Sequence, residues 1–98
     1  MWYIFNDGKT IGQIGSENGM IINDEEYKNS CRITIEKDGC TAPFSITCGV
    51  YGLMCHSVFS KSEIDVKSKY EDMKLELQEF IESNEDDYDW CEMFTSKW

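Results

Sequence analysis

The chain has 98 residues and a formal net charge of −10. That length favours a single domain spanning residues 1–98 with one modest core. The charge repels phosphate backbones and anionic headgroups, so we do not expect nucleic acid or a membrane to be the primary partner.

The N-terminal residues predict a compartment and a first β-hairpin. The start MWYIFNDGK lacks the features of a signal peptide, and no stretch is long and apolar enough to span a membrane, so we expect a cytoplasmic protein. Residues 2–6 form an aromatic and aliphatic run, and Asp7-Gly8 suits a two-residue turn because it accepts positive φ. We expect residues 10–14 to return as the second strand. Residues 20–23 would form a third strand that ends in an acidic turn at 24–26.

The clearest strand covers residues 31–36, where apolar and polar side chains alternate. Residues 44–48 alternate in the same way and predict its hairpin partner. Matching the two apolar faces predicts one register. This register pairs Ile35 with Phe44, Ile33 with Ile46, and Cys31 with Cys48.

The segment from Gly49 to Gly52 predicts either a turn or a bulge within one long strand. If it is a turn, residues 53–59 form a further strand. Leu53, Cys55 and Phe59 would then join the core face. Met54, His56 and Val58 would lie on the other face, beside Ser45 and Thr47.

From residue 61 the apolar period changes to three- and four-residue steps, which predicts a long amphipathic helix at about 61–83. The expected buried stripe contains Val66, Tyr70, Met73, Leu77, Phe80 and Ile81. Ser60 with Glu63, or Ser62 with Asp65, would cap its start, and Ser83-Asn84 would end it. The tail from Asp86 predicts a short second helix. The sequence thus predicts an α+β fold, with an antiparallel meander of five or six strands (about 2–59) packed against the long helix.

Sequence features do not favour catalysis, a metal or a cofactor. Five cysteines at irregular spacings fit free thiols better than a secreted disulfide framework. Cys31, Cys48, Cys55 and His56 could converge to bind a metal under the predicted register, but the close ligand pairs of structural zinc sites are missing. Neighbouring Cys55 and His56 would point to opposite faces of a strand, so they would not form a nucleophile–base pair. We therefore expect a non-enzymatic protein.

The polar face of the sheet is one candidate binding site. It combines one guanidinium, hydroxyl donors and an imidazole that could bind a small ligand. Its residues are Arg32, Thr34, Ser45, Thr47 and His56. The competing interpretation is a solvated sheet face on which Arg32 pairs with an acid. The ligand hypothesis would describe a small-ligand-binding or regulatory domain, with a homodimer as one of its forms.

The acidic tail is the leading candidate. Twelve of the nineteen acids fall in the last thirty-eight residues, and aromatic side chains are placed among them. The partner-binding residues we predict are Asp86, Asp87, Tyr88, Asp89, Trp90 and Glu92. Acids can attract a basic partner over a long range, while aromatic side chains supply binding energy. We also expect Trp90 and Phe94 to face the core. The sequence thus favours an immunity- or inhibitor-like protein that binds a basic protein.

Overall fold

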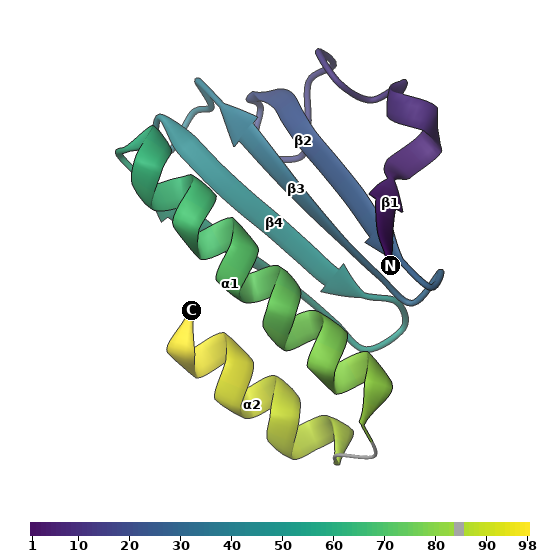
Figure 1. Ribbon diagram of the computed structural model, residues 1–98. Helices are drawn as coiled ribbons and strands as arrows, with labels where there is room; N and C mark the ends of the chain where they lie inside the picture. Colours follow the sequence, from purple (N-terminus) through teal and green to yellow (C-terminus); the bar gives the residue numbers. More distant parts are fainter. Residues whose placement is uncertain (84–85) are drawn as a thin grey trace.

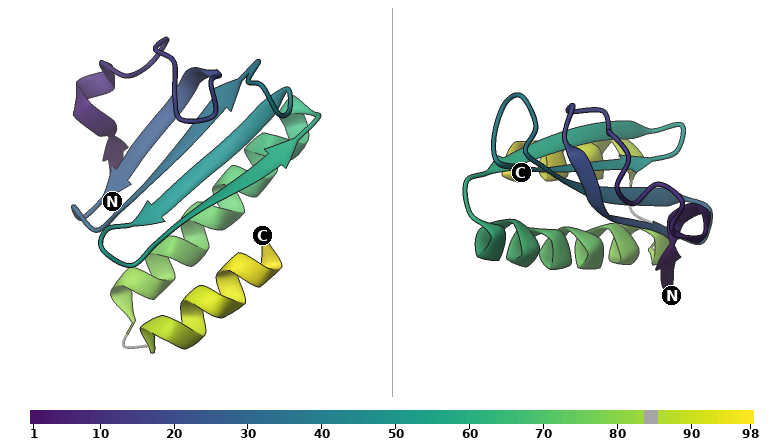
Figure 2. Two further views of the ribbon diagram at one scale, coloured as in Figure 1. Left: turned by 180° about the vertical axis from the view of Figure 1, so that it is seen from behind. Right: turned by 90° about the horizontal axis from the view of Figure 1, so that it is seen from above.

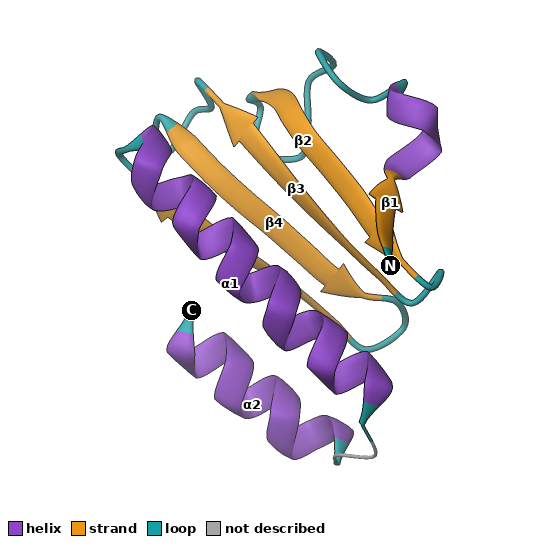
Figure 3. Cartoon of the chain, viewed as in Figure 1, coloured by secondary structure: helices purple, strands orange, loops and turns teal. Residues whose placement is uncertain are grey.

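The computed structural model describes residues 1–83 and 86–98, and it has the predicted α+β architecture (Figure 1). Five strands form one antiparallel meander in the order β1-β2-β3-β4-β5. The strands are β1 (Trp2–Ile4), β2 (Met20–Tyr27), β3 (Cys31–Lys37), β4 (Phe44–Val50) and β5 (Met54–Ser60). The helices are a short 3-10 turn η1 (Phe5–Gly8), α1 (Glu63–Glu82) and α2 (Asp87–Lys97), shown by type in Figure 3.

Helix α1 covers one face of the sheet, which we call the helix face; the opposite side is the outer face (Figure 2). The α1 helix begins as predicted, because the Ser62 hydroxyl accepts the backbone N–H of Asp65 at 3.1 Å. Its apolar stripe packs on the buried side chains of β3 and β4, including Ile33, Ile35 and Ile46. The predicted stripe is confirmed by the burial of Val66, Tyr70, Met73, Leu77 and Phe80, and its sixth member, Ile81, is partly buried.

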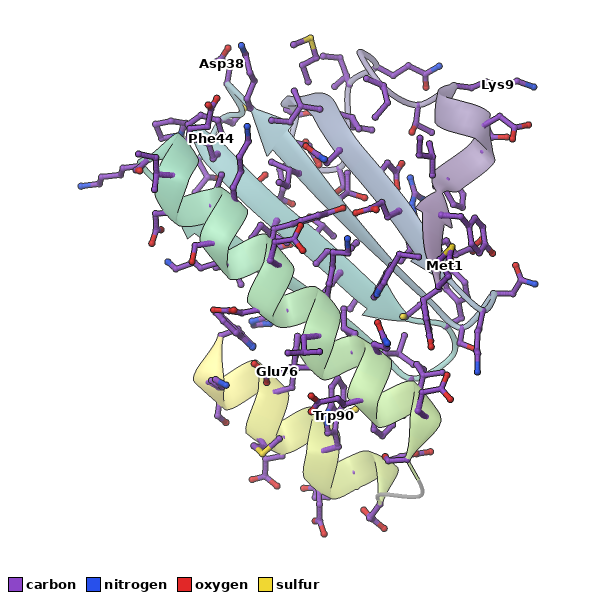
Figure 4. All side chains as sticks on the ribbon, in the orientation of Figure 1. Met1, Lys9, Asp38, Phe44, Glu76 and Trp90 are labelled. Atoms are coloured by element: carbon purple, nitrogen blue, oxygen red, sulfur yellow. The ribbon has the colours of Figure 1, made fainter. Side chains whose placement is uncertain are left out.

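Helix α2, also predicted, packs on α1 through aromatic rings. Trp90 stacks on Phe80 of α1 at a centroid distance of 4.1 Å and on Phe94 at 4.8 Å. Phe94 is fully buried, and Figure 4 shows the Trp90 side chain between the two helices. The expected inward orientation of Trp90 and Phe94 is therefore confirmed. Asn84, which we expected to help end α1, lies outside the described residues.

The N-terminal segment differs from the prediction. Asn6, Asp7 and Gly8 have the positive φ expected of a turn, but they form η1 rather than a two-residue hairpin. Residues 10–14 do not form the predicted strand, and β1 pairs with β2 instead. An isolated bridge between Ile14 and Met20 and backbone hydrogen bonds of Gly12 and Gln13 with Ile21 join this segment to β2. The segment crosses the outer face because its side chains bind groups there, as described below.

The acidic residues 24–26 continue β2 instead of forming the predicted turn. Each acid has a partner supplied by another part of the fold. Asp24 binds Arg32, Glu25 accepts the Tyr70 hydroxyl at 2.6 Å, and Glu26 accepts that of Tyr3 at 2.7 Å. These long-range contacts outweigh the weak strand propensity of acidic residues.

The β3–β4 hairpin forms, but its predicted register was wrong by two residues. Ile35 pairs with Ile46, Ile33 with Cys48, and Cys31 with Val50, so Cys31 and Cys48 are not directly opposite. A shift of two residues leaves the same side chains on each face, because the strand period is two. Apolar alternation alone therefore could not select the register.

The prediction was also wrong about which residues of β5 face the core. The turn has three residues, Tyr51 to Leu53, with positive φ at Gly52, and Val50 pairs with Met54. This shorter turn reverses the face of each later residue. Met54, His56 and Val58 are on the helix face, whereas Cys55 and Phe59 are on the outer face.

Replacing Phe94 with alanine should destabilise the fold by about 3–5 kcal/mol, because it removes a fully buried ring from the aromatic stack. Urea unfolding followed by tryptophan fluorescence would measure the loss. The exposed neighbour Met93 gives a matched control, and Met93→Ala should change stability by less than about 0.5 kcal/mol. Equal effects of the two substitutions would contradict the observed packing of α2.

Candidate functional site

The outer face is organised around the buried carboxylate of Asp24, whose side chain is 0% exposed. Arg32 donates to it from Nε at 2.8 Å and from Nη2 at 2.6 Å. The hydroxyls of Thr10 and Thr34 donate at 2.7 Å and 3.2 Å. The carboxylate thus has four donor groups, one from the N-terminal segment and three from β3, which compensate for its removal from water.

The Arg32 side chain is held in place on several sides. Its guanidinium lies 3.8 Å from the centre of the Phe5 ring, and Asp24 raises the pKa of the guanidinium by accepting its hydrogen bonds. Next to it, Glu26 accepts the hydroxyls of Tyr3 and Tyr51. Arg32 is therefore a fixed donor group and carries a permanent charge.

A second buried carboxylate fixes the N-terminal segment at the other end of β3. Glu36 accepts the backbone N–H groups of Glu17 at 3.1 Å and Gly19 at 3.0 Å. A Cβ at Gly15 would lie 2.4 Å from the Glu36 carboxylate, so only glycine allows this close approach. The segment thus lies along the outer face of β2 and β3, from Phe5 to Gly19.

Beside this segment lies an outer hollow with a volume of about 730 Å³, within the usual range for small-molecule sites. Its floor is formed by β3 and β4, and its ends by residues 13–16 and the β4–β5 turn. Arg32, Thr34 and Thr47 line the floor together with Gly49. Apolar side chains from the surrounding segments, among them Ile14 and Leu53, line the rest.

The structure brings together most of the residues predicted on the sheet face. Arg32, Thr34, Ser45 and Thr47 share the outer face, and all but Ser45 line the outer hollow. His56 does not belong with them. It faces the helices, where its ring lies edge-on to Phe94 at 6.3 Å, so its inclusion was wrong.

Sequence reasoning missed the residues that form the rest of this site. Asp24 was assigned to a turn, and Thr10 to a hairpin strand. Gly49 was interpreted as a turn residue, although it lies in the floor of the outer hollow. Residues 21–27 show no alternation of apolar and polar side chains, so the sequence carried no signal for Asp24.

The acidic tail forms a second candidate site. The α2 surface, as we call it, consists of the exposed residues Asp86, Asp87, Tyr88, Asp89, Glu92 and Met93. Asp86 also caps α2 by accepting the backbone N–H of Asp89 at 3.0 Å. Trp90, which we included in the predicted binding set, lies mostly behind this surface, with 4% of its area exposed. A hollow of about 280 Å³ lies among Asp86, Asp89, Trp90 and Met93.

The thiols and acids do not form an evident metal site. Within residues 1–83 and 86–98, no group of three or more His, Cys, Asp or Glu side chains is arranged to hold a metal ion. All five cysteines are free. Burial raises the pKa of the Cys31 thiol to about 11 and that of Cys48 to about 12, which makes both poor nucleophiles near neutrality.

Among the described residues, no helix has the length and apolar character needed to cross a membrane. No protein-family model, curated protein or solved structure matched this chain.

Substituting Asp24 with asparagine should destabilise the protein by about 3 kcal/mol, because Arg32 loses its paired carboxylate in a partly buried position. Urea unfolding would measure this loss. The control is Asp72→Asn on the exposed side of α1, which should cost less than about 0.5 kcal/mol. An Asp24→Asn protein as stable as the parent would show that the pair does not hold the outer face together.

The buried thiols predict a loss of stability at alkaline pH. Their folded pKa values of about 11 and 12 exceed the ordinary value of 9.0. The protonated thiols therefore contribute fully to the free energy of unfolding below pH 9. Above pH 9 this contribution is lost, because the unfolded chain releases these protons first. Each thiol should lower the free energy of unfolding by at most about 1.4 kcal/mol for each pH unit above pH 9. Urea unfolding between pH 8 and 10.5 should show a shallower decline for Cys48→Ala; an identical slope would contradict the assignment.

Proposed function

We propose that this chain is a non-enzymatic, immunity- or inhibitor-like protein that binds a basic protein through the α2 surface. The observation that carries the proposal is the set of four acids on this surface, Asp86, Asp87, Asp89 and Glu92. None of them forms an ion pair with a described residue, and Lys97, the only cation of α2, is engaged 2.8 Å from Glu76 of α1. Their combined negative field is therefore available to an approaching partner.

The structure also supplies apolar contact area among these acids. Tyr88 is 74% exposed and Met93 is 54% exposed. Both are carried by a helix whose opposite side is fixed by the stack of Trp90 on Phe80. A partner would thus meet a preorganised surface, which lowers the entropy cost of association.

The small hollow on the α2 surface suits a lysine or arginine side chain of the partner. Asp86 and Asp89 would face the cationic head, while Trp90 and Met93 would contact the aliphatic stem. By analogy of size and charge alone, a basic toxin or nuclease that the chain caps and inhibits is the kind of partner we propose.

The test begins with affinity capture from an extract of the source organism, with elution by a salt gradient. The captured basic protein is then purified and its Kd measured at 50 mM and 500 mM salt. Asp87→Asn/Asp89→Asn/Glu92→Gln neutralises three of the four acids of the α2 surface and keeps the Asp86 cap. We expect this triple variant to weaken binding by tenfold or more at 50 mM salt. The difference should shrink at 500 mM because salt screens exposed charges.

The matched control neutralises three exposed acids of α1, Glu63, Glu71 and Asp72. This control changes the net charge by the same amount as the α2 variant, but on a different helix. If the α2 surface is the interface, the control should weaken binding by less than twofold. Equal losses in the two triple variants would indicate that only the overall charge matters. Unchanged binding in the α2 variant would overturn the proposal.

A further inference from the structure

The register of β3, β4 and β5 determines which residues form the floor of the outer hollow. On the outer face, Gly49 lies between its partners Arg32 on β3 and Cys55 on β5. Glycine has no side chain, so the row is open at its centre and the backbone of β4 forms the floor. The next row, Thr34, Thr47 and Ser57, carries only short side chains. A space large enough for a ring therefore lies above β4.

The sides of the hollow are formed by segments that are fixed to the sheet. The N-terminal segment is held by Phe5 on Arg32, by Thr10 on Asp24, and by the backbone hydrogen bonds to Glu36. Ile14, on this segment, is 69% exposed although it lines the hollow, as does the exposed Leu53 of the β4–β5 turn. These side chains gain burial only if something enters the space.

Arg32, the cation that lines the hollow, has unused donors. Arg32 directs Nε and Nη2 at Asp24, and Nη1 has no acceptor among the described residues. The guanidinium plane is already fixed by the Phe5 ring and Asp24. Binding an oxygen atom at Nη1 would therefore require little further loss of side-chain freedom.

The charges of the lining favour a neutral occupant. The charged residues that line the hollow are Arg32, which is paired with Asp24, and Glu36, which accepts two backbone N–H groups. An anion would meet Asp24 behind the guanidinium and the net charge of −10. A cation would meet the guanidinium itself. A neutral molecule avoids both kinds of repulsion.

We propose that the outer hollow binds a small neutral organic molecule with a flat apolar ring and a carbonyl oxygen. The oxygen accepts from Nη1 of Arg32, and the ring lies over Gly49 with its edges against Leu53 and Ile14. This site does not depend on the α2 surface or on the partner proposed for it.

The test uses three probes that share one ring and differ in charge: benzamide, benzoate and benzylammonium. Cys55 lines the outer hollow and is exposed, so its alkylation by iodoacetamide reports occupancy, while exposed Cys40 lies outside the hollow and is the internal control. Benzamide at about 10 mM should slow alkylation of Cys55 at least threefold and leave Cys40 unchanged. A molecule of its size should bind with Kd of about 1 mM. Amide NMR shifts at Gly49 and Gly52 should give the same Kd.

Substitutions inside and outside the outer hollow test whether benzamide protects Cys55 by binding there. Ile14→Ser and Leu53→Ser alter exposed side chains of the hollow and should abolish protection, whereas Leu75→Ser on the exposed side of α1 should keep it. The triple variant of the α2 surface should bind benzamide normally. Stronger protection by benzoate or by benzylammonium would overturn the neutral-ligand assignment. Absence of both protection and NMR shifts with benzamide would overturn the site.

Discussion

The buried carboxylate of Asp24 is the constraint on which the outer half of the molecule depends. It lies in β2 with a fully buried side chain, and an unpaired charge there would cost several kcal/mol. Arg32 and Thr34 of β3 supply part of the compensation, but Thr10 must come from the N-terminal segment. That segment is therefore drawn onto the outer face over β2 and β3. The outer face over β4 stays open, and the outer hollow lies at the boundary.

The same strand also orders the helix face. The side chain of Glu25, next to Asp24, points the other way, where it accepts the Tyr70 hydroxyl at 2.6 Å and pairs with Lys74 at 2.8 Å. At the end of β2, the Tyr27 hydroxyl donates to Glu82 at 2.7 Å. Polar contacts thus hold α1 over β2, while apolar packing holds it over β3 and β4. The acids of β2 set the position of layers on both faces of the sheet.

The predictable part of the fold was the part governed by periodicity. The stripe of α1 and the alternation of β3 follow from apolar packing between the helix and one face of the sheet, so the sequence displays them directly. The path of the N-terminal segment depends on contacts such as Thr10 with Asp24, which join residues far apart in the chain. The face of His56 depended on a turn one residue shorter than expected. Periodicity was enough to place Arg32, Thr34 and Thr47 on one face of the sheet. It could not identify Asp24 or Gly49 as parts of their site, because their roles depend on long-range contacts and on the length of a turn.

The two proposed sites meet at a single element. Strand β5 carries Cys55, which lines the outer hollow, and His56, whose ring contacts Phe94 of α2. Successive side chains of a strand point to opposite faces, so an occupant of the outer hollow and a partner on the α2 surface would act on opposite sides of β5. Because β5 is hydrogen-bonded to β4 along its length, a shift on one side would have to move the paired strand as well. The geometry therefore favours independent binding at the two sites, with β5 between them.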